Sequence, residues 1–208
     1  EKVKADLVII AIGTSPSADL AQKAGLGVGE RGGIKVDGYM RTEDPNIFAI
    51  GDCAEKFSFF TGKPSALRLA TIATAEARIA AANLSKNQRK NEGAIGLFGT
   101  IIGDMGISVA GLTEKAAKDE GFEVVTGEAA SPDRHPGSMP NTSQIQTKLT
   151  FEQGTGRLLG GEVCGGRSVG EMGNILGSLI RGRATVEDVA TLQFGTHPAL
   201  TASPITYP

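Results

Sequence analysis

The sequence contains no tryptophan, and aromatic residues make up only 5% of its 208 residues. Its two cysteines, Cys53 and Cys164, are too few for a disulfide framework and do not have the spacing of a zinc site. The longest apolar stretch, residues 7–12, is far too short for a membrane span or a signal peptide. These absences argue against a disulfide-rich secreted domain and against a membrane protein. They favour a reducing cytoplasm as the location.

Charge is almost balanced, because the formal net charge is −2 and residues 86–90 form no more than a short basic patch. A nucleic-acid or membrane partner would require clustered basic residues, so neither is predicted. A metal protein is an alternative class, and its ligands would be His135, His197 and the two cysteines. These four residues are dispersed without ligand spacing, so no metal is predicted. Stoichiometric metal in the purified protein would favour that alternative.

Residues 47–50 form an apolar run that ends at Gly51 and Asp52. The run is long enough for one buried strand and lacks polar alternation, which is typical of a parallel sheet covered on both faces. Gly51 has no Cβ to block a ligand, and Asp52 would present a carboxylate at the carboxyl end of the strand. Open α/β sheets bind cofactors at that edge. The pattern therefore predicts a ligand site here, and an ordinary Gly-Asp turn is the alternative.

An earlier apolar run, residues 5–14, has the same form and closes at Gly13. It predicts a second buried strand, and the segment 11–16 reads Ala-Ile-Gly-Thr-Ser-Pro. Residues 17–25 then predict a short helix that ends at Gly25, and residues 32–37 predict a hairpin-like strand. The segment after Gly13 is equally compatible with a helix N-terminus capped by a serine.

These segments resemble the pyridine nucleotide-disulfide oxidoreductases, in order and in spacing. Thr42, a short spacer, the apolar run 47–50 and Gly51-Asp52 match the family's second FAD-binding motif, and residues 11–16 match its Ala-x-Gly-x-x-Pro signature. The resemblance implies that Asp52 hydrogen-bonds the ribitol hydroxyls of FAD, with Gly51 allowing the approach. A charge-assisted hydrogen bond of that kind contributes about 1.5–3 kcal/mol.

The resemblance also implies a role for a long helix, which the sequence predicts over residues 65–84. In the family this helix directs its N-terminus at the pyrimidine edge of the flavin, where free N–H groups stabilise negative charge. Leu69, Ala70 and Thr71 are the matching flavin-contacting residues. For Leu69, core packing is the alternative role.

Several sequence features of the family are not found in this sequence. No Gly-x-Gly-x-x-Gly fingerprint follows a first strand, and neither cysteine lies at the position of the family's redox cysteine. The sequence begins without methionine, close to a buried-looking strand. We therefore expect a carboxyl-terminal portion of a longer protein, inactive alone, whose parent binds FAD and either NADH or NADPH.

The polar stretch 85–92 predicts a boundary between a portion of an FAD-binding domain, residues 1–90, and a second domain, residues 93–208. In the second domain, alternation and turns predict five strands, a helix and two late helices that begin with capping boxes. The strands cover 95–102, 105–109, 122–127, 146–151 and 157–163, the helix covers 113–120, and the capping boxes are Ser168 with Glu171 and Thr185 with Asp188. The predicted class is α/β plus α+β, that is, a partial Rossmann-like domain followed by an α+β domain with a mostly antiparallel sheet. The second domain resembles the family's dimerisation domain, which implies a homodimer.

His197 and Pro198 match a His-Pro that reaches the partner's flavin site in the family's disulfide reductases, where a nearby glutamate orients the histidine. That carboxylate is absent here, so His197 is a candidate for either a catalytic or an interface role, and Tyr207 is a candidate for the same pocket. The resemblance is closest to the NADH oxidase and coenzyme A disulfide reductase group. It implies electron transfer from NAD(P)H through FAD to a small-molecule acceptor, namely oxygen, peroxide, a coenzyme A disulfide or another disulfide. The alternative is a dimerisation and scaffold module without activity.

Overall fold

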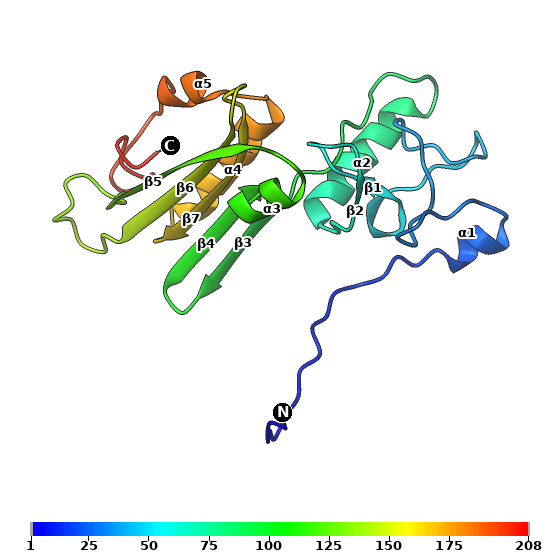
Figure 1. The fold of residues 1–208 in the computed structure, drawn as a ribbon, viewed down its shortest axis with the longest axis horizontal. Helices are drawn as coiled ribbons and strands as arrows, with labels where there is room; N and C mark the ends of the chain where they lie inside the picture. Colours follow the sequence, from blue (N-terminus) through cyan, green and yellow to red (C-terminus); the bar gives the residue numbers. More distant parts are fainter. Residues whose placement is uncertain (1, 208) are drawn as a thin grey trace. The chain divides into compact units, whose positions relative to one another are not determined.

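The computed structural model describes residues 2–207 of the chain. The contacts divide it into two compact units, drawn in Figure 1. The first unit contains the chain up to residue 57 together with residues 63–92. The second contains residues 58–62 and the chain from residue 93 onward. Within the described chain, no helix combines the length and the apolar character that crossing a membrane requires.

The first unit is built from short elements. Its helices are α1 (Asp19–Lys23), the 3-10 turn η1 (Gly51–Cys53) and α2 (Ala70–Asn83), and β1 (Lys56–Phe57) pairs antiparallel with β2 (Pro64–Ser65). The predicted helix at 17–25 is confirmed, because Ala24 caps α1 and Gly25 follows with a φ of 81°. The core of this unit consists mainly of small residues: Ala18, Ala21, Ile34, Met40, Ala49, Ala54, Ile79 and Ala80.

The predicted buried strand within residues 5–14 is not formed in the described chain. Leu7 is 77% exposed and Ile12 is 91% exposed, and the segment belongs to no sheet. An apolar run becomes a buried strand only when neighbouring strands pair with its backbone groups and other elements cover its faces. No strand among residues 2–207 pairs with this one. The apolar pattern predicts a segment that favours burial. The described chain provides no neighbouring strand that pairs with it.

The predicted strand at 47–50 is shorter than expected for the same reason. It is reduced to an isolated antiparallel bridge between Arg41 and Phe48. Ala49 is buried, but Ile47 is 38% exposed and Ile50 is 37% exposed. The hairpin-like strand at 32–37 is likewise reduced to bridges from Ile34 to two other segments.

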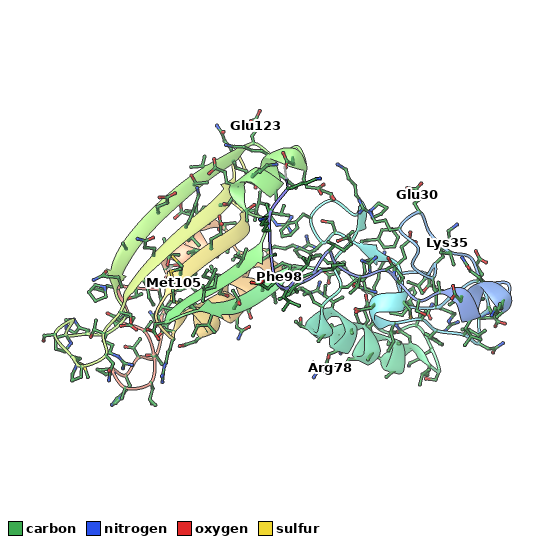
Figure 2. All side chains as sticks on the ribbon, turned by 90° about the horizontal axis from the view of Figure 1, so that it is seen from below. Glu30, Lys35, Arg78, Phe98, Met105 and Glu123 are labelled. Carbon is green, nitrogen blue, oxygen red and sulfur yellow. The ribbon has the colours of Figure 1, made fainter. Side chains whose placement is uncertain are left out.

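Helix α2 begins at Ala70 rather than at residue 65, because Pro64 and Ser65 form β2 instead. Its buried face is not made of apolar residues alone. The buried residues are Ile72, Glu76, Ile79, Ala80 and Asn83, so two polar side chains point inward. The exposed side of the helix carries Arg78, which is labelled in Figure 2.

The second unit is a five-stranded sheet in which every neighbouring pair is antiparallel, as predicted. Its order is β3-β4-β7-β6-β5 (Figure 1). The bounds are β3 (Leu97–Ile102), β4 (Met105–Gly111), β5 (Val124–Pro132), β6 (Gln144–Glu152) and β7 (Leu158–Gly165). All five strands lie where the sequence predicted them, although β5 continues well beyond residue 127. Figure 2 labels Phe98 and Met105 on the first hairpin, where they are 47% and 46% exposed.

Three helices complete this unit: α3 (Glu114–Asp119), α4 (Val169–Arg181) and α5 (Val186–Ala190). Helix α4 packs along one face of the sheet, against β3, β4 and β7 (Figure 1). Met172, Leu176 and Ile180 of this helix are fully buried and form the centre of the core. The helix can approach closely because it presents glycine: a Cβ at Gly173 would lie 1.8 Å from Oγ of Ser108.

The predicted capping box at the start of α5 is confirmed, because the side chains and backbone groups of Thr185 and Asp188 bond reciprocally. The predicted capping box of Ser168 and Glu171 is wrong. Ser168 has a helical backbone conformation and makes no side-chain cap bond. The carboxylate of Glu171 accepts a hydrogen bond from the hydroxyl of Tyr207 instead, at 2.6 Å. The two residues have the spacing of a capping box, but Glu171 bonds to Tyr207, which is distant in the sequence.

Candidate functional site

The backbone of the Gly51–Asp52 turn has a specific conformation that is held by hydrogen bonds. Ile50 enters it in an extended conformation, and Gly51 then adopts a φ of 70°, which strains any residue with a Cβ. The N–H of Ala54 closes the turn on the carbonyl oxygen of Gly51 at 3.1 Å. Gly51 itself is buried, whereas Asp52 is exposed. The turn therefore holds a fixed backbone inside and presents a carboxylate outside.

The segment leading into the turn is fixed by its pairing with residues 40–42. The N–H of Ala49 donates to the carbonyl oxygen of Met40 at 3.1 Å, and the N–H of Thr42 donates to that of Ile47 at 2.9 Å. The hydroxyl of Thr42 also donates to the carbonyl oxygen of Ile47 at 3.0 Å. Thr42, the first residue of the motif, thus closes the loop that delivers the chain to Gly51.

A buried ion pair lies beneath the turn. Nζ of Lys56 and Oε2 of Glu76 are 3.0 Å apart, and their side chains are only 4% and 2% exposed. Oε2 of Glu76 also accepts the N–H of Gly51 at 2.8 Å. Nζ of Lys56 donates to the carbonyl oxygens of Gly51 and Ala54. The pair therefore connects η1, β1 and α2 through one set of hydrogen bonds.

Two opposing effects act on the Glu76 carboxyl. Burial is the larger one, and it raises the pKa of Glu76 above its ordinary value because the charged form loses its hydration. The charge and hydrogen bond of Lys56, and the N–H of Gly51, act in the opposite direction and lower that pKa in part. The carboxylate thus depends on Lys56 for its charge.

The start of α2 belongs to the same site. Gly51 lies against the helix, since a Cβ placed on it would be 3.5 Å from Cβ of Ala73. Leu69 is the half-buried N-cap residue in an extended conformation and makes no side-chain cap bond, while Ala70 and Thr71 are exposed. The first turn of a helix carries unsatisfied N–H groups and a partial positive charge.

The five predicted cofactor contacts, Gly51, Asp52, Leu69, Ala70 and Thr71, therefore belong to one unit and to two elements that pack together. Arg68 adds a link to the segment matching the Ala-x-Gly-x-x-Pro signature, because Nη1 of Arg68 donates to the carbonyl oxygen of Thr14 at 2.9 Å. A carboxylate acceptor beside a helix N-terminus suits a ligand that carries both hydroxyl groups and developing negative charge.

His197 belongs to the second unit and is exposed. Its N–H donates to Oγ1 of Thr201 at 3.0 Å, and its Nδ1 accepts the N–H of Ala199 at 3.2 Å. No carboxylate bonds to this histidine among the described residues. Tyr207 is buried and stacks on Phe194 with ring centroids 4.1 Å apart, and its hydroxyl bonds to Glu171.

The two cysteines are half-buried and lie in different units. Sγ of Cys53 bonds to the carbonyl oxygen of Ile50 at 3.3 Å, and Sγ of Cys164 lies 3.8 Å from Oε1 of Gln146. Residues 2–207 contain no cluster of three or more histidine, cysteine, aspartate or glutamate side chains that could hold a metal ion.

Sequence reasoning missed Lys56 and Glu76, although one signal for Glu76 was present. Ile72, Glu76, Ile79 and Asn83 recur at helical spacing, so the inward face of α2 could be read with its polar members included. Lys56 gave no comparable signal, because β1 is only two residues long.

Comparison with known proteins agrees with this geometry. Residues 1–77 match the family described as pyridine nucleotide-disulphide oxidoreductase, and residues 97–206 match the dimerisation domain of the same family. These matches confirm the resemblance inferred from residues 11–16 and 42–52.

Among similar curated proteins, an NADH oxidase of Methanocaldococcus jannaschii is 31% identical over 91% of this chain and 42% of its own length. A CoA-dependent NAD(P)H sulfur oxidoreductase of Pyrococcus furiosus is 35% identical over 78% of this chain and 36% of its own length. The structure of an NAD-dependent persulfide reductase from A. fulgidus matches with a TM-score of 0.88 and 34% identity, and the match covers 98% of this chain and 37% of that one. The chain thus spans less than half the length of these relatives.

Proposed function

Because this chain belongs to the pyridine nucleotide-disulphide oxidoreductase family, we propose that it forms the ribitol-binding and dimerisation part of an FAD-dependent NAD(P)H oxidoreductase. The observation that carries the proposal is the Gly51–Asp52 turn, where an exposed carboxylate follows a buried glycine with its backbone fixed on α2. The family is FAD- and NAD(P)H-dependent. When bound, FAD supplies the ring that takes up electrons from NAD(P)H.

The residues of this chain fit that cofactor by their donor and acceptor chemistry. Asp52 offers a carboxylate that accepts hydrogen bonds from ribitol hydroxyls. Leu69, Ala70 and Thr71 form the start of α2, whose N–H groups stabilise negative charge by up to about 2 kcal/mol when partly buried. In this assignment Asp52 binds and orients the flavin chain, while the helix N-terminus stabilises the reduced ring.

The second unit is proposed to form a homodimer, and His197 is proposed to approach the partner's flavin site. The dimerisation-domain match supports the first assignment. For His197, the support is that the residue is exposed, while its Nδ1 accepts the N–H of Ala199. The absence of a carboxylate bonded to His197 in the described chain favours an interface role over an acid–base dyad.

The proposal also includes the class of electron acceptor. The similar proteins include an NADH oxidase and enzymes acting on sulfur and persulfide, so we propose a small-molecule acceptor, either oxygen or a sulfur–sulfur bond. A cytoplasmic location and an active parent protein are proposed along with it. A dimerisation module without activity of its own remains the second candidate for this chain, supported by its span of less than half the length of its relatives.

Amide-resolved NMR of the 208-residue chain tests the ribitol contact. Riboflavin is titrated in parallel with lumiflavin, which has the same ring without the ribitol chain. We expect riboflavin, but not lumiflavin, to shift the amide signal of Asp52, and Asp52→Asn to remove the difference. Equal shifts with both flavins would contradict the ribitol assignment.

Light scattering on a sizing column, with absorbance read at flavin wavelengths, tests the assembly. We expect a dimer that carries no flavin after purification. A monomer would overturn the dimerisation assignment, whereas retained FAD with a shifted spectrum would count against a module that only dimerises.

A further inference from the structure

The two peptide groups that flank Gly51 are both held by buried charged side chains. We propose that Lys56 and Glu76 are positioning residues, which fix the backbone of Gly51 and thereby the placement of the Asp52 carboxylate toward the flavin ribitol. The inference rests on the proposed function of Asp52. It assigns the orientation of Asp52 to an ion pair whose two side chains are buried.

The geometry of the hydrogen bonds supports this assignment. The N–H of Gly51 belongs to the peptide group before its Cα, and it donates to Oε2 of Glu76 at 2.8 Å. The carbonyl of Gly51 belongs to the peptide group after its Cα, and it accepts from Nζ of Lys56. Fixing both peptide planes fixes φ and ψ of the residue between them. Glycine is the residue with the most backbone freedom to lose, so this is where an external restraint has the largest effect.

The ammonium group of Lys56 has no bonding capacity left for any other role. It has three donors, and these bond to the carbonyl oxygens of Gly51 and Ala54 and to Glu76. Two of its three partners are therefore backbone groups of the turn that contains Asp52. An ion pair serving only to join β1 to α2 would not need these bonds.

The same pair links Asp52 to the other proposed flavin contact. Glu76 lies on the buried face of α2, between Ile72 and Ile79, so it moves with that helix. The start of α2 at Ala70 is the proposed partner of the flavin ring. The Lys56–Glu76 pair therefore sets the position of the ribitol-binding turn relative to the helix N-terminus.

The competing explanation is that the pair merely stabilises the fold. Replacing a buried ion pair by apolar residues of similar size often leaves the stability of the fold unchanged or raises it. The same replacement here removes every hydrogen bond that Lys56 and Glu76 make to the turn. The double variant Lys56→Met/Glu76→Leu thus separates the two explanations. A matched control is Lys115→Met/Asp119→Leu, which makes the same changes in an exposed ion pair of α3.

The experiment measures backbone order parameters by NMR in the 208-residue chain, together with its thermal unfolding. In the wild type and the control we expect rigid amides at Gly51 and Asp52, with order parameters of about 0.85. In the Lys56→Met/Glu76→Leu variant we expect these to fall below about 0.6, while the amides of α2 stay rigid. Unchanged order at both residues in a folded double variant would overturn the inference.

A measurement on the wild type covers the case in which the double variant does not fold. The N–H of Gly51 should exchange with deuterium as slowly as the buried amides of α2, since its acceptor is a buried carboxylate. Fast exchange at Gly51 would likewise overturn the inference. Neither measurement uses a flavin, so failure here is distinct from failure of the riboflavin titration that tests the role of Asp52.

Discussion

Glu76 occupies a position at which its side chain is only 2% exposed, and one lysine balances its charge. Removing one partner of a buried pair leaves an uncompensated charge, which costs about 3–5 kcal/mol. We therefore expect Lys56→Met alone to lower the free energy of unfolding of the first unit by about that amount at neutral pH. Chemical denaturation followed by NMR signals of α2 measures it. Lys115→Met is the control, because that side chain is 85% exposed and its loss should have little effect.

The stability that Lys56→Met loses should become smaller as the pH falls. Burial already raises the pKa of Glu76 above 4.5, and Lys56 opposes that effect, so removing Lys56 raises the pKa further. A carboxyl whose pKa is raised in the folded state binds its proton more tightly there than in the unfolded chain. The variant should therefore recover stability as the pH falls through the raised folded pKa toward 4.5. A deficit that is constant with pH would contradict the assigned charge state.

Tyr207 provides a second prediction from a single residue. Burial, followed by the hydrogen bond to Glu171, raises the pKa of Tyr207 to about 12. Tyr207→Phe keeps the stacking on Phe194 and removes a hydrogen bond to a charged acceptor, so we expect a loss of about 1.5–3 kcal/mol near neutral pH. The wild-type advantage should be complete below pH 10 and should disappear as the pH rises through about 12. Denaturation across this range measures it, and an advantage that did not change between pH 10 and about 12 would contradict the assignment.

At the scale of elements, α4 offers a matched pair of glycines. A Cβ at Gly173 would lie 1.8 Å from Oγ and 2.9 Å from Cβ of Ser108, whereas a Cβ at Gly170 would have no heavy atom within 4 Å. We expect Gly173→Ala to push the helix from the sheet and lower the free energy of unfolding by about 1–3 kcal/mol. Gly170→Ala should instead raise it by up to about 1 kcal/mol through helix propensity. Thermal unfolding compares the two variants, and equal effects would show that α4 does not pack against β4 as closely as described.

The sequence predicted those elements whose determinants are local. The five strands of the second unit follow from alternation and from turns such as Gly103-Asp104 between β3 and β4, and α3 follows from Thr113 and Gly121 at its ends. The segments at 7–12 and 47–50 could not be settled in the same way, because a strand needs partners that its own residues do not specify. The site shows the same limit. The sequence motif and the order of the elements were enough to predict Asp52 and the start of α2. The Lys56–Glu76 contact joins residues twenty positions apart, and only the folded structure shows that they meet.

At the scale of the whole molecule, the two compact units are not two consecutive stretches of the sequence. Residues 58–62 precede α2 in the sequence but belong with the second unit. Phe59 is 6% exposed in the core of that unit, and its N–H donates to the carbonyl oxygen of Ala94 at 3.1 Å. The guanidinium carbons of Arg157, Arg181 and Arg183 lie 5.3, 5.4 and 4.8 Å from its ring centre. The division predicted at residues 90 and 93 remains a prediction, and a fragment that began at residue 93 would lack this ring.

We therefore expect Phe59→Ala to destabilise the second unit, although the substitution lies outside residues 93–208. Truncating a buried phenylalanine costs about 3–5 kcal/mol, and the three arginines lose a cation–π partner as well. Amide signals of β6 and β7 should disappear at a lower denaturant concentration in the variant. Phe57→Ala is the matched control, because Phe57 is 38% exposed in β1 of the first unit and its loss should leave β6 and β7 unchanged. If Phe59→Ala destabilised only α2 and its neighbours, residues 58–62 would belong with the first unit, and the second could be separated at residue 93 without loss.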